Sequence, residues 1–78
     1  MMKIEVLGTG CAKCKRLLAN VQEAAKDLGA EAEVIKVDSI DELVERGVMS
    51  TPALFIDGKM QLSGRVATVD ELKRLLQG

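Results

Sequence analysis

The stretch Gly8-Thr9-Gly10-Cys11-Ala12-Lys13-Cys14 contains both cysteines of this chain, and it joins an expected strand to an expected helix. Side chains three residues apart lie on one face of a helix, so the two sulfur atoms can approach closely enough to form a bond. A helix N-terminus favours an anion, and such positions lower a cysteine pKa to roughly 3.5 to 7.5. The stretch therefore predicts a redox-active dithiol in which Cys11 is the reactive thiolate.

The pattern of apolar residues that follows predicts a helix from about residue 11 to residue 28, which Gly29 ends. Its apolar stripe has a period of 3.6 residues and comprises Cys14, Leu17, Leu18, Val21, Ala25 and Leu28. Cys14 thus lies on the buried stripe, whereas Cys11 lies one turn earlier, at the solvent end of the helix. This difference predicts that Cys11 attacks and that Cys14 is the sheltered, resolving thiol.

Strand signals occur at four places in the chain. Residues 3–7, 33–37 and 60–62 are short apolar or alternating runs, and Ala53–Ile56 is an unbroken apolar run typical of a strand covered on both faces. Asp57-Gly58 between the last two strands is typical of a tight hairpin turn, so these two strands should be antiparallel.

Two further helices begin with a capping box, a Ser or Thr followed three residues later by Glu. Ser39 and Glu42 open a short helix that Gly47 ends, and Thr68 and Glu71 open the last helix. Each of the two carries one apolar face, comprising Ile40, Leu43 and Val44 in the first and Val69, Leu72, Leu75 and Leu76 in the second.

The order of elements is therefore βαβαββα. A strand, crossover helix and second strand form a right-handed parallel unit, and the later hairpin adds an antiparallel pair. We predict one α/β domain over residues 1–78, with a four-stranded mixed sheet flanked by three helices.

Composition excludes several classes of function. The chain contains one Phe, no Trp and no Tyr, so aromatic platforms for stacking bases are lacking. Eleven basic and twelve acidic residues leave a net charge of -1, which attracts neither nucleic acid nor a membrane surface. No apolar run approaches the ~18 residues of a membrane span, and the first residues do not resemble a signal peptide. We expect a cytoplasmic protein, where a lone cysteine pair is more typical of catalysis or metal binding than of a structural bridge.

The chain has a CxxC motif after its first strand and Thr51-Pro52 ahead of its final ββα segment. In these features it resembles the thioredoxin-like superfamily, and the resemblance covers nearly the whole chain. The chain looks most like the small, glutaredoxin-sized thioredoxins of archaea and bacteria. The resemblance implies that Cys11 is the nucleophile, Cys14 the resolving thiol and Pro52 a cis-proline beside the disulfide. It also implies that the backbone of Thr51 pairs with an extended segment of the substrate.

We expect a monomer that needs no cofactor besides its own disulfide. Its partners would be proteins that contain disulfides and an electron donor similar to thioredoxin reductase.

Two charged residues are further candidates. Glu5 precedes Cys11 by six residues, the offset at which thioredoxins place a buried acid that assists proton transfer to the resolving cysteine. Burial would give Glu5 a raised pKa and the role of general base; the competing interpretation is a charge at a strand edge or sheet end. Lys13 is the cation nearest to both sulfurs and could favour the thiolate, although the helix pattern points it toward solvent.

Other functions remain open at this point. Small copper carriers also place a CxxC after their first strand, and two thiolates suit Cu(I). Those carriers have Met where this chain has Thr9, and they end on a strand rather than a helix. In a third class the disulfide would only staple the fold. The third glycine of a phosphate-binding GxGxxG loop is missing, because Lys13 occupies its place.

Overall fold

The structure, a computed structural model, describes residues 2–10, 12–29 and 31–77. Over these residues it contains, in chain order, β1 (Met2–Leu7), α1 (Ala12–Leu28), β2 (Ala32–Val37), α2 (Ile40–Glu45), β3 (Ala53–Ile56), β4 (Lys59–Ser63) and α3 (Val69–Leu76). The predicted βαβαββα order is confirmed, and the ends of the described elements lie within a residue or two of their expected positions.

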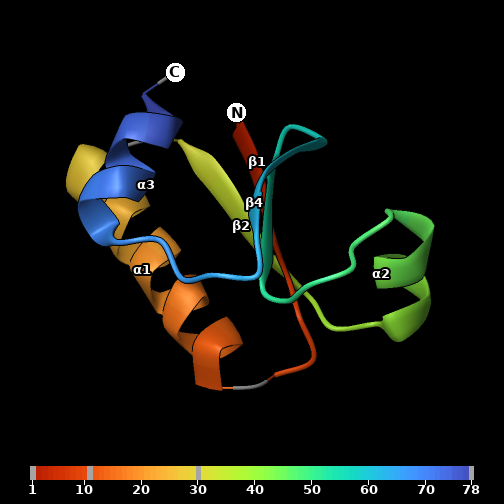
Figure 1. The fold of residues 1–78 in the computed structure, drawn as a ribbon. Coiled ribbons are helices and arrows are strands. Elements are labelled where there is room, and N and C mark those ends of the chain that lie inside the picture. The colour runs from red at the N-terminus through yellow and green to blue at the C-terminus, as the bar shows by residue number, and fades with distance from the viewer. Residues whose placement is uncertain (1, 11, 30, 78) are drawn as a thin grey trace.

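The four strands form one mixed sheet in the order β2-β1-β3-β4. β1 pairs with β2 in parallel and with β3 antiparallel, and β4 is antiparallel to β3. Asp57 and Gly58, both with positive φ, form the tight turn between β3 and β4. β1 and β3 are therefore central strands, and the predicted mixed sheet is confirmed (Figure 1).

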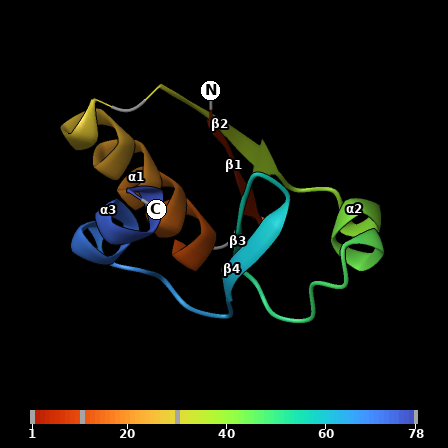
Figure 2. The same cartoon turned by 90° about the horizontal axis from the view of Figure 1, so that it is seen from above.

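Helices α1 and α3 lie side by side on one face of the sheet, and α2 lies on the other (Figure 2). Successive residues of a strand point to opposite faces, so Ile4 and Val6 of β1 face α1 while Glu5 and Leu7 face α2. The larger core lies under α1 and α3, and its buried residues are Ile4, Val6, Leu17, Val21, Ala24, Ala25, Leu54, Ile56, Leu62, Ala67, Leu72 and Leu76.

The core on the α2 face is much smaller and consists of Leu7, Leu43, Ala53 and Phe55. Of the three apolar residues Ile40, Leu43 and Val44 that the sequence places in α2, only Leu43 is buried. Ile40 is 66% exposed and Val44 71% exposed. A helix of six residues makes fewer than two turns, so few of its side chains can reach the sheet.

Both predicted caps are formed in the structure. The hydroxyl of Ser39 accepts a hydrogen bond from the Glu42 N–H at 3.4 Å, and that of Thr68 accepts one from the Glu71 N–H at 3.2 Å. These bonds satisfy N–H groups that the first turn of a helix leaves without partners. None of the helices in the described ranges is both long and apolar enough to cross a membrane.

Candidate active site

Cys14 lies in the first turns of α1 and is 4% exposed, as its place on the apolar stripe predicts. Cys11, the predicted nucleophile, lies outside the described residues. Ala12 and Lys13 begin α1, so the described part of the CxxC motif is helical. Lys13 itself is exposed, which agrees with a side chain directed to solvent.

Three segments converge around the Cys14 side chain. They are Gly8, which directly follows β1, the start of α1, and the loop that carries Pro52. A Cβ atom placed on Gly8 would lie 3.0 Å from the Cβ of Cys14 and 3.8 Å from the Cα of Pro52. The fold therefore brings Cys14 and Pro52, 38 positions apart in the sequence, to the same small region.

The Thr51–Pro52 peptide bond is cis, and Pro52 is among the fully buried residues. The Pro52 carbonyl accepts a hydrogen bond from the Gly64 N–H at 2.9 Å, which ties the loop to the end of β4. Thr51 is half-buried and lies two residues before the start of β3. The backbone at Thr51 is thus held in place on the side of the fold where Cys14 lies.

Glu5 is not part of this region, and two expectations about it are wrong. Glu5 is 4% exposed on a central strand, paired across to Ile35 and Phe55, so it lies neither at an edge nor at a sheet end. Its pKa is lowered, not raised. The Arg46 guanidinium, by hydrogen bonding and then by its charge, holds the pKa of this carboxyl below its ordinary value of 4.5, although burial acts in the opposite direction.

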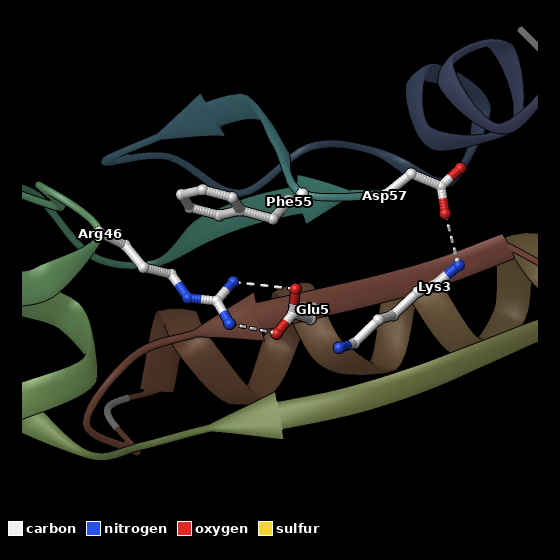
Figure 3. A pocket seen from close by; sticks show the side chains of 6 residues that line it. Lys3, Glu5, Arg46, Phe55 and Asp57 are labelled. Carbon is white, nitrogen blue, oxygen red and sulfur yellow. Dashed lines mark hydrogen bonds and ion pairs between the residues drawn. The ribbon is translucent and has the colours of Figure 1, made fainter.

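Arg46, which sequence reasoning missed, binds Glu5 with both ends of its guanidinium. Nη1 and Nη2 donate to the two carboxylate oxygens at 2.8 and 2.6 Å (Figure 3). Its Nε donates to Glu42 one turn earlier, at 2.9 Å, and the guanidinium lies over the ring of Phe55, 5.3 Å from its centre. We call Glu5, Glu42, Arg46 and Phe55 the arginine clasp. It joins the C-terminal end of α2 to the sheet.

The clasp borders an open depression on the α2 face. Its lining residues are Lys3, Glu5, Arg46, Phe55, Asp57 and Gly58. Because Ile4 and Val6, on either side of Glu5, face α1 instead, the sheet separates this depression from Cys14. The structure thus brings Cys14 and Pro52 together and leaves Glu5 on the opposite face.

Within the described ranges, no three His, Cys, Asp or Glu side chains gather closely enough to hold a metal ion. The chain also continues from β4 into α3 rather than into a strand, unlike the copper carriers considered above.

Comparison with known proteins agrees with this geometry. Residues 2–77 match the thioredoxin domain family. A thioredoxin of Methanothermobacter thermautotrophicus is 45% identical over 76 residues, which cover 97% of this chain and 99% of the relative. A thioredoxin of Methanocaldococcus jannaschii is 36% identical, covering 99% of this chain and 88% of the relative.

Solved structures give the same fold at lower identity. Thioredoxin-2, described as a component of the protein secretion machinery of the malaria parasite, superimposes with a TM-score of 0.79 at 17% identity, covering 99% of this chain and 82% of the other. The germline-specific thioredoxin Deadhead of Drosophila melanogaster gives a TM-score of 0.64 at 23% identity, with 97% and 78% covered.

Fold and sequence together define a thioredoxin-like protein, which confirms the resemblance drawn from the CxxC and Thr-Pro motifs. The chain belongs to the thioredoxin domain family, with relatives named thioredoxin that it matches over nearly their whole length. It is a protein-disulfide oxidoreductase.

Proposed function

We propose that this protein reduces disulfides of target proteins through the dithiol of Cys11 and Cys14. The observation that carries the proposal is the convergence of the buried Cys14, Gly8 and Pro52 at one end of the sheet. A helix that starts directly after Cys11 supports a thiolate there, because its N–H groups and dipole favour negative charge.

The reaction proceeds by two exchanges. The Cys11 thiolate attacks one sulfur of the target disulfide, forming a mixed disulfide and releasing the other target sulfur as a thiolate, which takes up a proton. Cys14 then loses its proton and attacks the Cys11 sulfur. The second target sulfur leaves, and two electrons have moved from the dithiol to the target. A separate reductase returns two electrons to the Cys11–Cys14 disulfide.

Thr51 and Pro52 are proposed to hold the target. An extended segment next to the target disulfide would pair with the backbone of Thr51, as a strand added to an exposed backbone edge does. The hydrogen bond from Gly64 to the Pro52 carbonyl supports this role, because it fixes the loop before the target arrives. Action as a monomer in the cytoplasm, with no cofactor beyond the disulfide, completes the proposal.

Glu5 has no step in this mechanism. The ion pair with Arg46 keeps the pKa of Glu5 low, and a carboxylate with a low pKa is a weak base near neutral pH. Glu5 lies on the α2 face of the sheet, and none of its described contacts connects it to the thiols. Its role is the structural one of holding Arg46.

The test is insulin-disulfide reduction with dithiothreitol as the electron source, using Cys11→Ser and Cys14→Ser variants. Cys11→Ser should be inactive. Cys14→Ser, reduced beforehand and mixed with insulin after the dithiothreitol is removed, should form mixed disulfides that persist, which intact-mass spectrometry detects as protein plus insulin chain. Reduction by Cys11→Ser at close to the unmodified rate, or no trapped adduct with Cys14→Ser, would show that the two roles are assigned wrongly.

Target binding at Thr51 has its own measurement. In a mixed disulfide between the Cys14→Ser variant and a disulfide-derived peptide, the Thr51 amide and its neighbours should show altered NMR shifts. The α2 amides, on the other face, serve as the internal control and should not change. Shifts confined to α2 would contradict the proposed binding segment.

A further inference from the structure

Gly8 occupies a crowded position at the end of β1. It is buried, and a Cβ added to it would lie 3.0 Å from the Cβ of Cys14 and nearer still to the Cys14 sulfur. Non-bonded Cβ atoms essentially never come so close to other heavy atoms, because packed interiors leave no room for such overlap. The Cys14 sulfur therefore lies against the position where a side chain of residue 8 would begin.

The backbone conformation does not account for glycine at this position. Gly10, Gly29 and Gly58 have positive φ, a region that favours glycine, but Gly8 does not. The contact with Cys14 is the steric reason that the structure offers. Glycine is the residue that allows such a close approach of a backbone to another group.

The backbone at Gly8 also has little freedom to move away from an added methyl group. The Gly8 N–H donates to the Val37 carbonyl at 2.9 Å, which continues the pairing of β1 with β2. Pro52 also limits movement of the Gly8 backbone, since the Pro52 Cα lies 3.8 Å from the same Cβ position. A side chain at position 8 would consequently displace Cys14.

We propose that Gly8 is a positioning residue for the Cys14 thiol and that it sets the balance between the dithiol and the disulfide. This inference rests on the proposed function of the Cys11–Cys14 pair. A disulfide requires a narrow range of distances and angles between its two cysteines, and two separate thiols do not, so the disulfide tolerates a displaced Cys14 less well. A side chain at position 8 therefore costs the disulfide more free energy than the dithiol.

The test measures the equilibrium in which protein dithiol and oxidised dithiothreitol give protein disulfide and reduced dithiothreitol. Thiols are alkylated at each buffer ratio and the two protein forms are counted by mass spectrometry. Gly8→Ala should lower the equilibrium constant for disulfide formation about tenfold, in line with the cost of overfilling a packed site. Thr9→Ala, an exposed neighbour that adds no atom near Cys14, is the matched control and should change it less than about twofold.

Two results would overturn the inference. If Gly8→Ala leaves the constant within about twofold of the unmodified value while lowering the stability of both redox forms equally, Gly8 serves packing alone. If the unmodified protein forms no Cys11–Cys14 disulfide, the proposed function fails and the inference fails with it. Disulfide formation in the unmodified protein with no shift in Gly8→Ala refutes the inference alone.

The Gly8→Ala chain could also fail to fold, and a second variant covers that case. Cys14→Ala removes the sulfur that the new methyl group would meet, so Gly8→Ala combined with Cys14→Ala should recover folding, measured against Cys14→Ala by circular dichroism. Recovery supports the contact between position 8 and the sulfur. A double variant that remains unfolded shows that the clash is not with the Cys14 sulfur, and the inference is then wrong.

Discussion

Glu5 shows how one partner changes the chemistry of a buried residue. Burial alone would raise the pKa of a carboxyl and make it a candidate proton carrier. Two hydrogen bonds from Arg46 reverse the direction, so the pKa of Glu5 is lowered and the group remains charged. A buried ion pair of this kind is expensive to break, because either partner alone would be a buried charge without compensation.

Glu5→Gln should therefore affect stability and not catalysis. Gln keeps the size of the side chain and part of its hydrogen bonding to Arg46, so we expect a loss of about 1 to 2 kcal/mol in the free energy of unfolding. The rate of insulin reduction should keep the same dependence on pH. A shifted pH profile in Glu5→Gln would return Glu5 to the mechanism and contradict its assignment to the arginine clasp.

Lys13 is the cation of the CxxC motif, and its exposure limits what it can do. Water and salt screen an exposed charge, so its effect on a neighbouring thiolate is small. We expect Lys13→Gln to change the rate of insulin reduction by less than about threefold, since an exposed interaction is worth less than about 1 kcal/mol. A much larger loss would show that Lys13 stabilises the thiolate or contacts the target.

At the scale of elements, the two helices with predicted caps differ in how firmly they are held. α3 packs against α1 in the larger core, and both Leu72 and Leu76 are buried. α2 buries only Leu43 and depends on the arginine clasp for a second attachment. Helices with few buried contacts open locally without global unfolding.

Thr68→Ala and Ser39→Ala should consequently have different effects. Removing the Thr68 cap should lower the free energy of global unfolding by about 1 kcal/mol, measured by denaturant titration. Removing the Ser39 cap should instead speed hydrogen exchange of the α2 amides and leave the α1 amides nearly unchanged. Equal slowing or speeding of exchange in both helices would show that α2 opens only with the rest of the molecule.

At the scale of the whole molecule, the arginine clasp links stability to pH. A carboxyl whose pKa is lowered on folding adds stability above its ordinary pKa, and this contribution is lost as the pH falls through the folded value. Glu71, whose pKa is lowered by the exposed Arg65, acts in the same direction but more weakly because solvent screens the pair. Stability should thus decline below about pH 4.5.

Arg46→Gln should reverse the sign of this dependence. Without the guanidinium, burial raises the pKa of Glu5, so protonation on moving from pH 7 toward pH 5 stabilises the fold, whereas the unmodified protein keeps its stability over this range and loses it only below about pH 4.5. At pH 7 the loss should be about 2 to 4 kcal/mol, toward the lower end for a buried pair because Arg46 is 24% exposed. Arg65→Gln, on the exposed pair, is the control and should keep the original sign. The same sign in Arg46→Gln would contradict the clasp.

Much of the fold could be predicted because its signals are local. Caps, turn residues and the period of apolar side chains each depend on a few neighbouring residues, as at Ser39, Thr68 and Asp57-Gly58. The partner of Glu5 could not be predicted, because any of eleven basic residues could in principle have paired with it. The extent to which α2 is buried could not be predicted for a similar reason: how much of a helix touches a sheet depends on tertiary geometry, not on periodicity.

The candidate site likewise has one feature that the sequence predicts and one that it does not. The buried state of Cys14 followed from its place on the helix stripe, whereas the crowding around Gly8 arises from three segments that meet only in the folded chain. Glycine beside a strand end indicated a turn and nothing more. Only the structure relates that residue to the Cys14 thiol.

The position of Phe55 beneath Arg46 has a practical consequence for spectroscopy. It is the single aromatic residue of the chain, so its ring protons give an isolated group of NMR signals without assignment by mutation. Ring-current shifts fall off steeply with distance, and the Arg46 side-chain protons would carry them only while the guanidinium remains stacked. Proton spectra recorded at a series of pH values or temperatures would accordingly report when the helix at residues 40–45 leaves the sheet.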